Sequence, residues 1–95
     1  WIDTYGSTFG NLPNIGSAYG YMYMDITARA LEIACRDLTT DSFLNALESI
    51  NDYKIPFGDT VLSWSPEKHL GANVAYLFEV QNGTFIQTDN KEYTY

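Results

Sequence analysis

Residue types that could do chemistry are few and scattered in this chain. His69 is the single histidine, in the stretch SPEKHLG, and no GxSxG motif accompanies it. Nucleophilic catalysis requires a nucleophile oriented by a base, usually a histidine. A zinc site requires three or four converging ligands, and one histidine with the single cysteine, Cys35, leaves only scattered carboxylates to complete it. The sequence therefore favours a protein that is not an enzyme and holds no metal or other cofactor.

Two features of the sequence are compatible with a functional site. Paired carboxylates for acid–base catalysis are recognised by their separation in space, which the order of twelve acidic residues does not give. The alternating tyrosines Tyr19, Tyr21 and Tyr23 present ring faces with hydroxyl groups, which suit recognition of a small apolar or aromatic ligand. Packing at the start of a helix is the favoured explanation of the same tyrosines.

Length and composition together predict an incomplete structure. Ninety-five residues allow at most one small domain, because so short a chain has a large surface for its volume. Yet 45% of the residues are hydrophobic and 16% are aromatic. This apolar excess indicates missing partner surface. The chain begins at Trp1 without an initiator methionine, so we expect a processed product or a trimmed fragment.

Charge and hydropathy exclude several classes of partner. Five basic residues against twelve acidic ones give a net charge of −7, without the clusters of Lys and Arg that bind nucleic acid or anionic membranes. No stretch reaches the roughly 18 to 20 apolar residues of a membrane span, and there is no signal peptide. Cys35 alone forms no internal disulfide, and its apolar neighbours predict a small buried side chain.

The first half of the chain predicts a loop and two helices. Glycines, a proline and aromatic residues fill residues 1–20, which favours a loop. A helical pattern begins at Tyr21 and runs to about residue 38, with an alternating charge row on one face. Thr39 or Thr40 before Asp41 marks the start of a second helix with an apolar face over residues 43–50. The charge row comprises Asp25, Arg29, Glu32 and Arg36.

The second half predicts strands. Residues 60–65 alternate as a short strand, and a polar, solvated loop that includes His69 follows. Residues 74–80 and 84–88 form a hairpin around Asn82-Gly83, a pair typical of a type I′ turn. Both faces of the first arm carry apolar residues, so we expect both to be covered. Residues 89–95 are expected to be loose or to form an edge.

The ordered set of these segments resembles the C-terminal part of type I periplasmic solute-binding proteins of ABC transporters, the branched-chain amino-acid receptor family. The similarity lies in YMYMDITARALEIA at residues 21–34, FLNALESI at residues 43–50, GDTVLSWSPEKHLG at residues 58–71, and the closing hairpin at residues 74–85. It covers roughly residues 15–88. No single motif is diagnostic, and Ala34-Cys35 replaces the family's usual Ala-Gly.

The resemblance implies an α/β fold that is one fragment of a two-lobed receptor, comprising a two-helix unit, a short strand and a C-terminal hairpin. Residues 1–20 would lead into the helices, residues 21–71 would belong to one lobe, and residues 72–95 would cross to the other lobe. The parent would be the periplasmic, or at least extracytoplasmic, substrate-binding component for amino acids or related small apolar or aromatic carboxylates. It would dock on an ABC permease.

The resemblance also implies ligand contacts. The segment before the first helix lies near the interlobe cleft in this family, so Ser17, Tyr19 and Tyr21 are the expected ligand-binding residues. We expect the fragment alone to self-associate through its uncovered apolar faces. Two alternatives stay open: a free-standing small α+β interaction domain, and the same bilobed fold as the ligand-sensing domain of a signalling protein.

Overall fold

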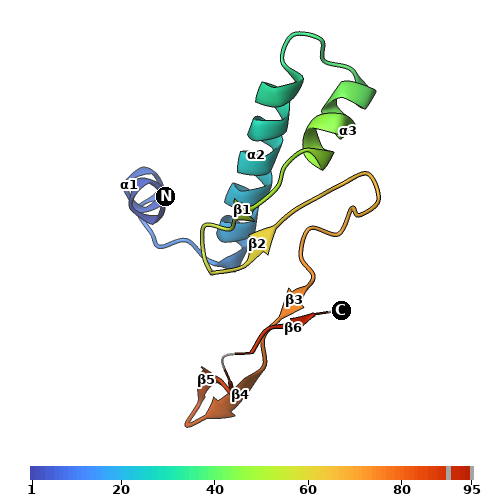
Figure 1. The fold of residues 1–95 in the computed structure, drawn as a ribbon. Helices are drawn as coiled ribbons and strands as arrows, with labels where there is room; N and C mark the ends of the chain where they lie inside the picture. The colour runs from blue at the N-terminus through green and yellow to red at the C-terminus, as the bar shows by residue number, and fades with distance from the viewer. Residues whose placement is uncertain (90, 95) are drawn as a thin grey trace.

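The computed structural model describes residues 1–89 and 91–94 and is a small mixed α/β structure (Figure 1). The described residues contain three helices and six short strands, which pair antiparallel as β1–β2, β3–β6 and β4–β5. The helices are α1 (Ile2–Phe9), α2 (Ile15–Ala34) and α3 (Thr40–Glu48), and the strands are β1 (Tyr53–Lys54), β2 (Val61–Leu62), β3 (Val74–Ala75), β4 (Phe78–Gln81), β5 (Thr84–Gln87) and β6 (Tyr93–Thr94).

The predicted loop over residues 1–20 is wrong, because this segment forms α1 and the start of α2. The hydroxyl groups of Ser7 and Thr8 donate to the carbonyl of Thr4, so these polar residues are satisfied within the helix. Helix α1 ends at Gly10, whose φ of 72° suits a glycine. Asn14 then caps α2, and its side chain accepts a hydrogen bond from the Ser17 amide at 3.0 Å.

Helix α2 ends earlier than predicted, and Cys35 is exposed rather than buried. Cys35 takes a φ of 56°, which ends the helix and turns the chain towards α3. The predicted start of α3 is confirmed. Thr39 is its N-cap and forms a capping box with Ser42, in which each side chain accepts the other residue's backbone N–H.

The core lies between α2, α3 and the β1–β2 ribbon. Ala30 and Ala46 are almost fully buried, and these small side chains let the two helices approach closely. Strand β1 was not expected; it places Tyr53 opposite Leu62 and presents both to the helices. The buried cluster consists of Met22, Ile26, Ala30, Ala46, Ile50, Tyr53 and Leu62.

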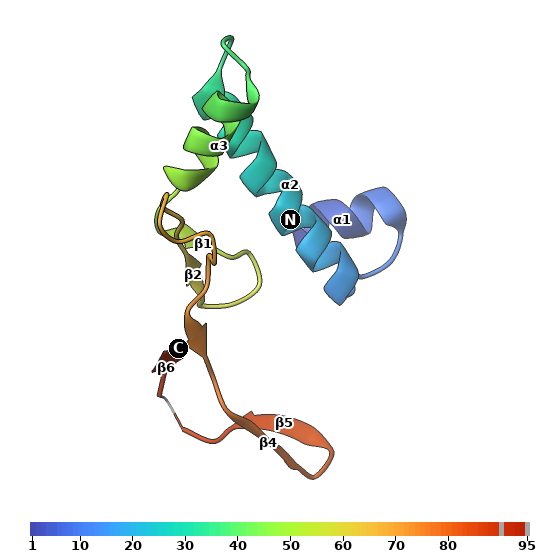
Figure 2. The same ribbon diagram turned by 90° about the vertical axis from the view of Figure 1, so that its right-hand side faces the viewer.

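Residues 73–89 and 91–94 form an arm that leaves this unit (Figures 1 and 2). The strand predicted over residues 74–80 is interrupted, because β3 pairs with β6 and β4 pairs with β5. The predicted turn is confirmed: Asn82 and Gly83 have φ angles of 52° and 79°. Among the described residues, no strand of the arm packs against α1, α2, α3, β1 or β2.

The β4–β5 hairpin is apolar on one face, not on both as expected. Cross-strand pairing puts Val80 opposite Phe85, with Phe78 on the same face, and all three are exposed. The other face carries Glu79 opposite Ile86 and is otherwise polar. The second face was expected to be apolar because of Ala75 and Leu77. The strand is interrupted before β4, so both residues lie outside this ladder.

The whole chain is extended and leaves much apolar surface uncovered. Its radius of gyration is 16.5 Å, whereas a compact chain of this length has about 12 Å. Its accessible surface is 7204 Å², compared with about 5,500 Å² for a compact protein of the same mass. The excess, about 1,700 Å², is slightly more than the total area of a standard protein interface, about 1,600 Å².

Candidate functional site: an aromatic hollow

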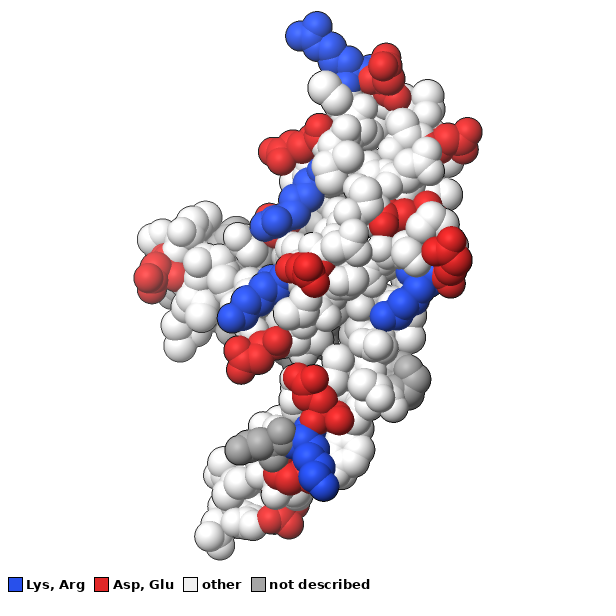
Figure 3. Space-filling model, viewed as in Figure 1, with Lys and Arg blue, Asp and Glu red and all other residues white. Residues whose placement is uncertain are grey.

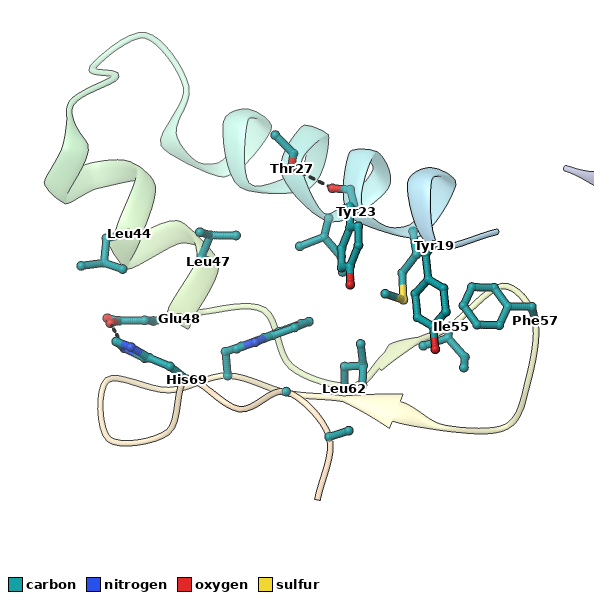
Figure 4. Close-up of a pocket in the computed structure, with 15 residues that line it drawn as sticks. Tyr19, Tyr23, Thr27, Leu44, Leu47, Glu48, Ile55, Phe57, Leu62 and His69 are labelled. Carbon is teal, nitrogen blue, oxygen red and sulfur yellow. Dashed lines mark hydrogen bonds and ion pairs between the residues drawn. The ribbon is translucent and has the colours of Figure 1, made fainter. Parts of the chain in front are cut away.

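A hollow of about 630 Å³ lies between α2, α3, the β1–β2 ribbon and the loop of residues 63–72. We call it the aromatic hollow. Figure 4 shows side chains from α2 on one side of it and side chains from the β1–β2 ribbon on the other. The lining residues are Tyr19, Met22, Tyr23, Ile26, Thr27, Leu44, Leu47, Glu48, Ile55, Phe57, Leu62, Trp64, His69, Gly71 and Ala72.

Three rings at the N-terminal end of α2 form one wall. Tyr19 and Tyr23 stack with ring centroids 6.1 Å apart, because residues four positions apart share a helix face. Phe57 meets Tyr19 edge to face at 5.4 Å. Figure 4 shows both tyrosine side chains pointing from α2 towards the ribbon. Such walls suit the apolar or aromatic part of a small ligand.

The opposite wall depends on a close contact between Trp64 and Gly71. A Cβ atom at residue 71 would lie 2.6 Å from the Trp64 ring, so glycine is required for the loop to pass the indole. The loop is held further by the Ser63 amide, which donates to the Gly71 carbonyl at 3.1 Å. This role of Gly71 was not predicted, since the contact exists only in the folded loop.

One polar pair closes the hollow beside α3. His69 Nε2 lies 2.8 Å from Glu48 Oε1, and since a carboxylate oxygen can only accept, the imidazole nitrogen donates. The Glu48 side chain is only 12% exposed, whereas that of His69 is 64% exposed. This contact ties the loop of residues 63–72 to α3. His69 is still largely exposed, as the prediction of a solvated loop requires, and the contact with Glu48 is an addition that the sequence did not indicate.

A second polar group joins α2 to β1. The Tyr53 hydroxyl donates to Asp25 Oδ2 at 2.8 Å, and Arg29 bonds the same carboxylate oxygen at 3.1 Å. The Arg29 guanidinium also sits 5.0 Å from the centre of the Tyr53 ring. Burial, followed by the hydrogen bond to Asp25, raises the pKa of Tyr53 to about 12. These contacts fix α2 on the β1–β2 ribbon.

The structure does not bring Ser17, Tyr19 and Tyr21 together. Tyr19 lines the aromatic hollow. Tyr21 stacks on Trp1 on another face of α2, with centroids 5.1 Å apart. The Ser17 hydroxyl donates to Tyr5 of α1 at 3.0 Å. A helix turns about 100° per residue, so residues 19 and 21 point about 200° apart and cannot line one surface.

Sequence reasoning missed Phe57 and Trp64 as lining residues. Tyr23 lies four residues after Tyr19, so the two side chains share a helix face. This could have been predicted if the helix had been expected to include residue 19. Phe57 and Trp64 reach the hollow only because the chain turns back at β1–β2, and two-residue strands leave almost no pattern in a sequence.

Among residues 1–89 and 91–94, no group of three or more His, Cys, Asp or Glu side chains is placed to hold a metal ion. Within the same residues, no helix has the length and hydropathy of a membrane span. Comparison with protein-family models, with curated proteins and with solved structures found no match to this chain.

Proposed function

We propose that this chain is the C-terminal part of a two-lobed, type I solute-binding protein of an ABC transporter. Its parent binds an amino acid or a related small, partly apolar or aromatic carboxylate, and does no chemistry on it. The parent works in the periplasm or another extracytoplasmic space and delivers the solute to a membrane permease. The sequence resemblance is the source of this proposal, and three features of the structure support it.

The observation that carries the proposal is the division of the chain near residues 72–73. The helical unit with β1–β2 lies on one side of this point, and the arm of residues 73–89 and 91–94 lies on the other without packing on it. A chain that crosses from one lobe to the other is expected to divide in this way. The expected crossover, between about residues 71 and 74, coincides with the division.

Uncovered apolar surface on both parts is the second support. Phe85 of the hairpin is 77% exposed, and Met24 of α2 is 67% exposed. Inside a larger receptor, both surfaces would lie against sheet and helices supplied by the rest of the parent. Covering them would contribute roughly 25 cal/mol for each Å² of apolar surface removed from water.

The aromatic hollow is the third support, because it matches the proposed solute class. Tyr19, which the resemblance placed at the cleft, lies in the hollow with Phe57 and Trp64. In the proposed mechanism, the solute binds between the lobes and contacts both of them in the closed state. It therefore shifts the population towards closure, and the permease recognises the closed receptor.

Ligand screening on the full-length parent tests this proposal. Amino acids and aromatic carboxylates are added in turn, and a ligand selective for the native state raises the melting temperature. Tyr19→Ala should weaken the binding of the best ligand at least about tenfold, because it removes a ring from the hollow. Tyr21→Ala is the matched control, since Tyr21 packs on Trp1 and should leave affinity within about threefold. Equal losses in both variants, or no stabilising solute, would contradict the proposal.

The free-standing interaction domain is a second candidate, which the exposed apolar residues of α2 and the hairpin also favour. This candidate differs from the receptor proposal in the length of the gene that it requires. A free-standing domain requires no further polypeptide in the same gene, whereas the receptor proposal requires a reading frame that extends some hundreds of residues upstream. Sequencing that region decides between the two.

A further inference from the structure

The turn between β4 and β5 joins two residues that can react with each other. Asn82 is followed by Gly83, and none of the other six asparagines in the chain precedes a glycine. The side-chain carbonyl carbon of an asparagine can be attacked by the backbone nitrogen of the next residue, which closes a five-membered ring. Glycine has no side chain to hinder that approach. Asn82-Gly83 is therefore the pair in this chain at which ring closure is least hindered.

The structure leaves this turn open to solvent. Asn82 and Gly83 are both exposed. A Cβ atom placed on Gly83 would meet no heavy atom within 4 Å beyond its chain neighbours. The space-filling view of Figure 3 shows the arm projecting from the rest of the molecule, and Figure 1 shows the β4–β5 hairpin at its far end. Water therefore reaches both reacting groups.

The Gly83 amide takes no part in the pairing of the two strands. That pairing ends with Gln81 opposite Thr84, the two residues that flank the turn. In a two-residue turn the closing hydrogen bond joins these flanking residues, so the amide of the second central residue is not used. Within the described residues, no hydrogen bond holds the Gly83 amide. This nitrogen can therefore give up its proton and act as a nucleophile.

The hairpin gives the turn little protection. Ring closure requires the turn to open briefly, because the side-chain carbonyl carbon of Asn82 must reach the Gly83 nitrogen. Four residue pairs hold β4 and β5 together, and every residue of both strands is exposed. Among the described residues, no helix packs on either strand. A two-stranded hairpin without such support is at best marginally stable, so the turn opens readily.

We propose that Asn82 is a site of spontaneous deamidation. The Gly83 nitrogen loses its proton and bonds to the side-chain carbonyl carbon of Asn82. The bond from that carbon to the side-chain nitrogen breaks, and ammonia leaves with the proton. Water then adds to one carbonyl of the resulting succinimide, the bond from that carbon to the ring nitrogen breaks, and the nitrogen takes a proton. Opening at the side-chain carbonyl gives aspartate, and opening at the main-chain carbonyl gives isoaspartate.

The two products affect the hairpin differently. Aspartate before glycine still suits a type I′ turn, so this product keeps the hairpin. Isoaspartate carries the main chain through its side-chain carbon, which lengthens the turn and disturbs the register of the strands. The apolar pair of Val80 and Phe85 then loses its fixed alignment. Either product adds one negative charge to a chain of net charge −7. The modification is independent of the solute-binding proposal.

Incubation of the chain at neutral pH, followed by tryptic digestion and tandem mass spectrometry, tests the proposal. Asn73 is the internal reference, since it is exposed and lies in the same tryptic peptide, residues 69–91, but precedes the branched Val74. Asn82 should deamidate at least about tenfold faster than Asn73, because a branched side chain hinders the attacking nitrogen and glycine does not. Isoaspartate should be among the products. Equal rates, or aspartate alone, which indicates direct hydrolysis without a ring, would overturn the proposal.

Two further measurements separate the effect of the glycine from that of the fold. The rate at Asn82 in the native chain should be within about threefold of the rate in guanidinium chloride, because the hairpin protects the turn so little. A greater protection in the native chain would contradict this.

Gly83→Ala places a side chain beside the nitrogen and strains a turn in which residue 83 has a φ of 79°. The strain opens the turn and by itself would speed the reaction. The added methyl group should nevertheless slow deamidation of Asn82 at least about tenfold, because it hinders the nitrogen directly. An unchanged or higher rate in Gly83→Ala would show that the Gly83 nitrogen is not the nucleophile.

Discussion

At the scale of single residues, burial and polar contacts together hold Tyr53 in place. Tyr53 is only 4% exposed, and its hydroxyl, the Asp25 carboxylate and the Arg29 guanidinium form one connected group. The phenol must stay protonated to donate to Asp25. Ionisation would put a second negative charge beside the carboxylate in a poorly solvated position.

Alkaline pH should therefore destabilise the folded chain through Tyr53. Its pKa is about 12 in the folded state and 10.0 in the reference state, so the folded state retains the proton between these values. Stability from this group is complete below about pH 10 and falls by roughly 2 kcal/mol as the pH rises to about 12. Urea unfolding at several pH values measures this slope.

Tyr53→Phe is the control for that measurement. It removes the titrating hydroxyl while keeping the ring against the core, so the fall in stability between about pH 10 and 12 should become shallower. Hydrogen bonds to Glu92 and Asp89 also raise the pKa values of Tyr76 and Tyr93, which contribute equally in both proteins. The same slope in the native chain and in Tyr53→Phe would exclude the role assigned to Tyr53.

At the scale of elements, local end signals decide the lengths of the helices. The Thr39–Ser42 capping box satisfies backbone donors at the start of α3, a helix of only nine residues. Thr39→Ala should lower the free energy of unfolding by about 1 kcal/mol. Thr40→Ala is the matched control, since Thr40 lies within the helix and makes no capping bond; its effect should be within about 0.5 kcal/mol. Chemical denaturation measures both, and equal effects would contradict the role of the cap.

Signals of this kind made α3 and the β4–β5 turn predictable from the sequence. The hydroxyl cap at Thr39 and the Asn82-Gly83 pair act over three or four residues, and both appear where expected. Helix α1 was missed because its glycine and hydroxyl residues are typical of loops. Tertiary contacts outweigh that local preference, since Trp1 stacks on Tyr21.

The candidate site was less predictable than the helices. Tyr19, one of the three expected ligand-binding residues, lines the aromatic hollow. The resemblance grouped Tyr21 with it, and the helix was expected to begin only at Tyr21, so residues 19 and 21 had no fixed separation. Once α2 begins at Ile15, the helical rotation separates the two tyrosines. Phe57 and Trp64 depend on the return of the chain at β1–β2.

At the scale of the whole molecule, the uncovered surface is the dominant feature. The arm lies apart from the helical unit, and Val80 and Phe85 present an apolar face to solvent. An extended chain with an accessible surface of 7204 Å² loses much of the burial that normally balances conformational entropy. Its stability should therefore depend on contacts that a single copy does not make.

The midpoint of urea unfolding, measured over a range of chain concentrations, tests this central claim most directly. If the apolar surfaces require protein beyond one copy, association stabilises the native state by mass action, and the midpoint rises with concentration. The most dilute samples should unfold gradually and at low urea. A sharp two-state transition whose midpoint is the same at every concentration would show that one copy is sufficient, and would contradict the claim.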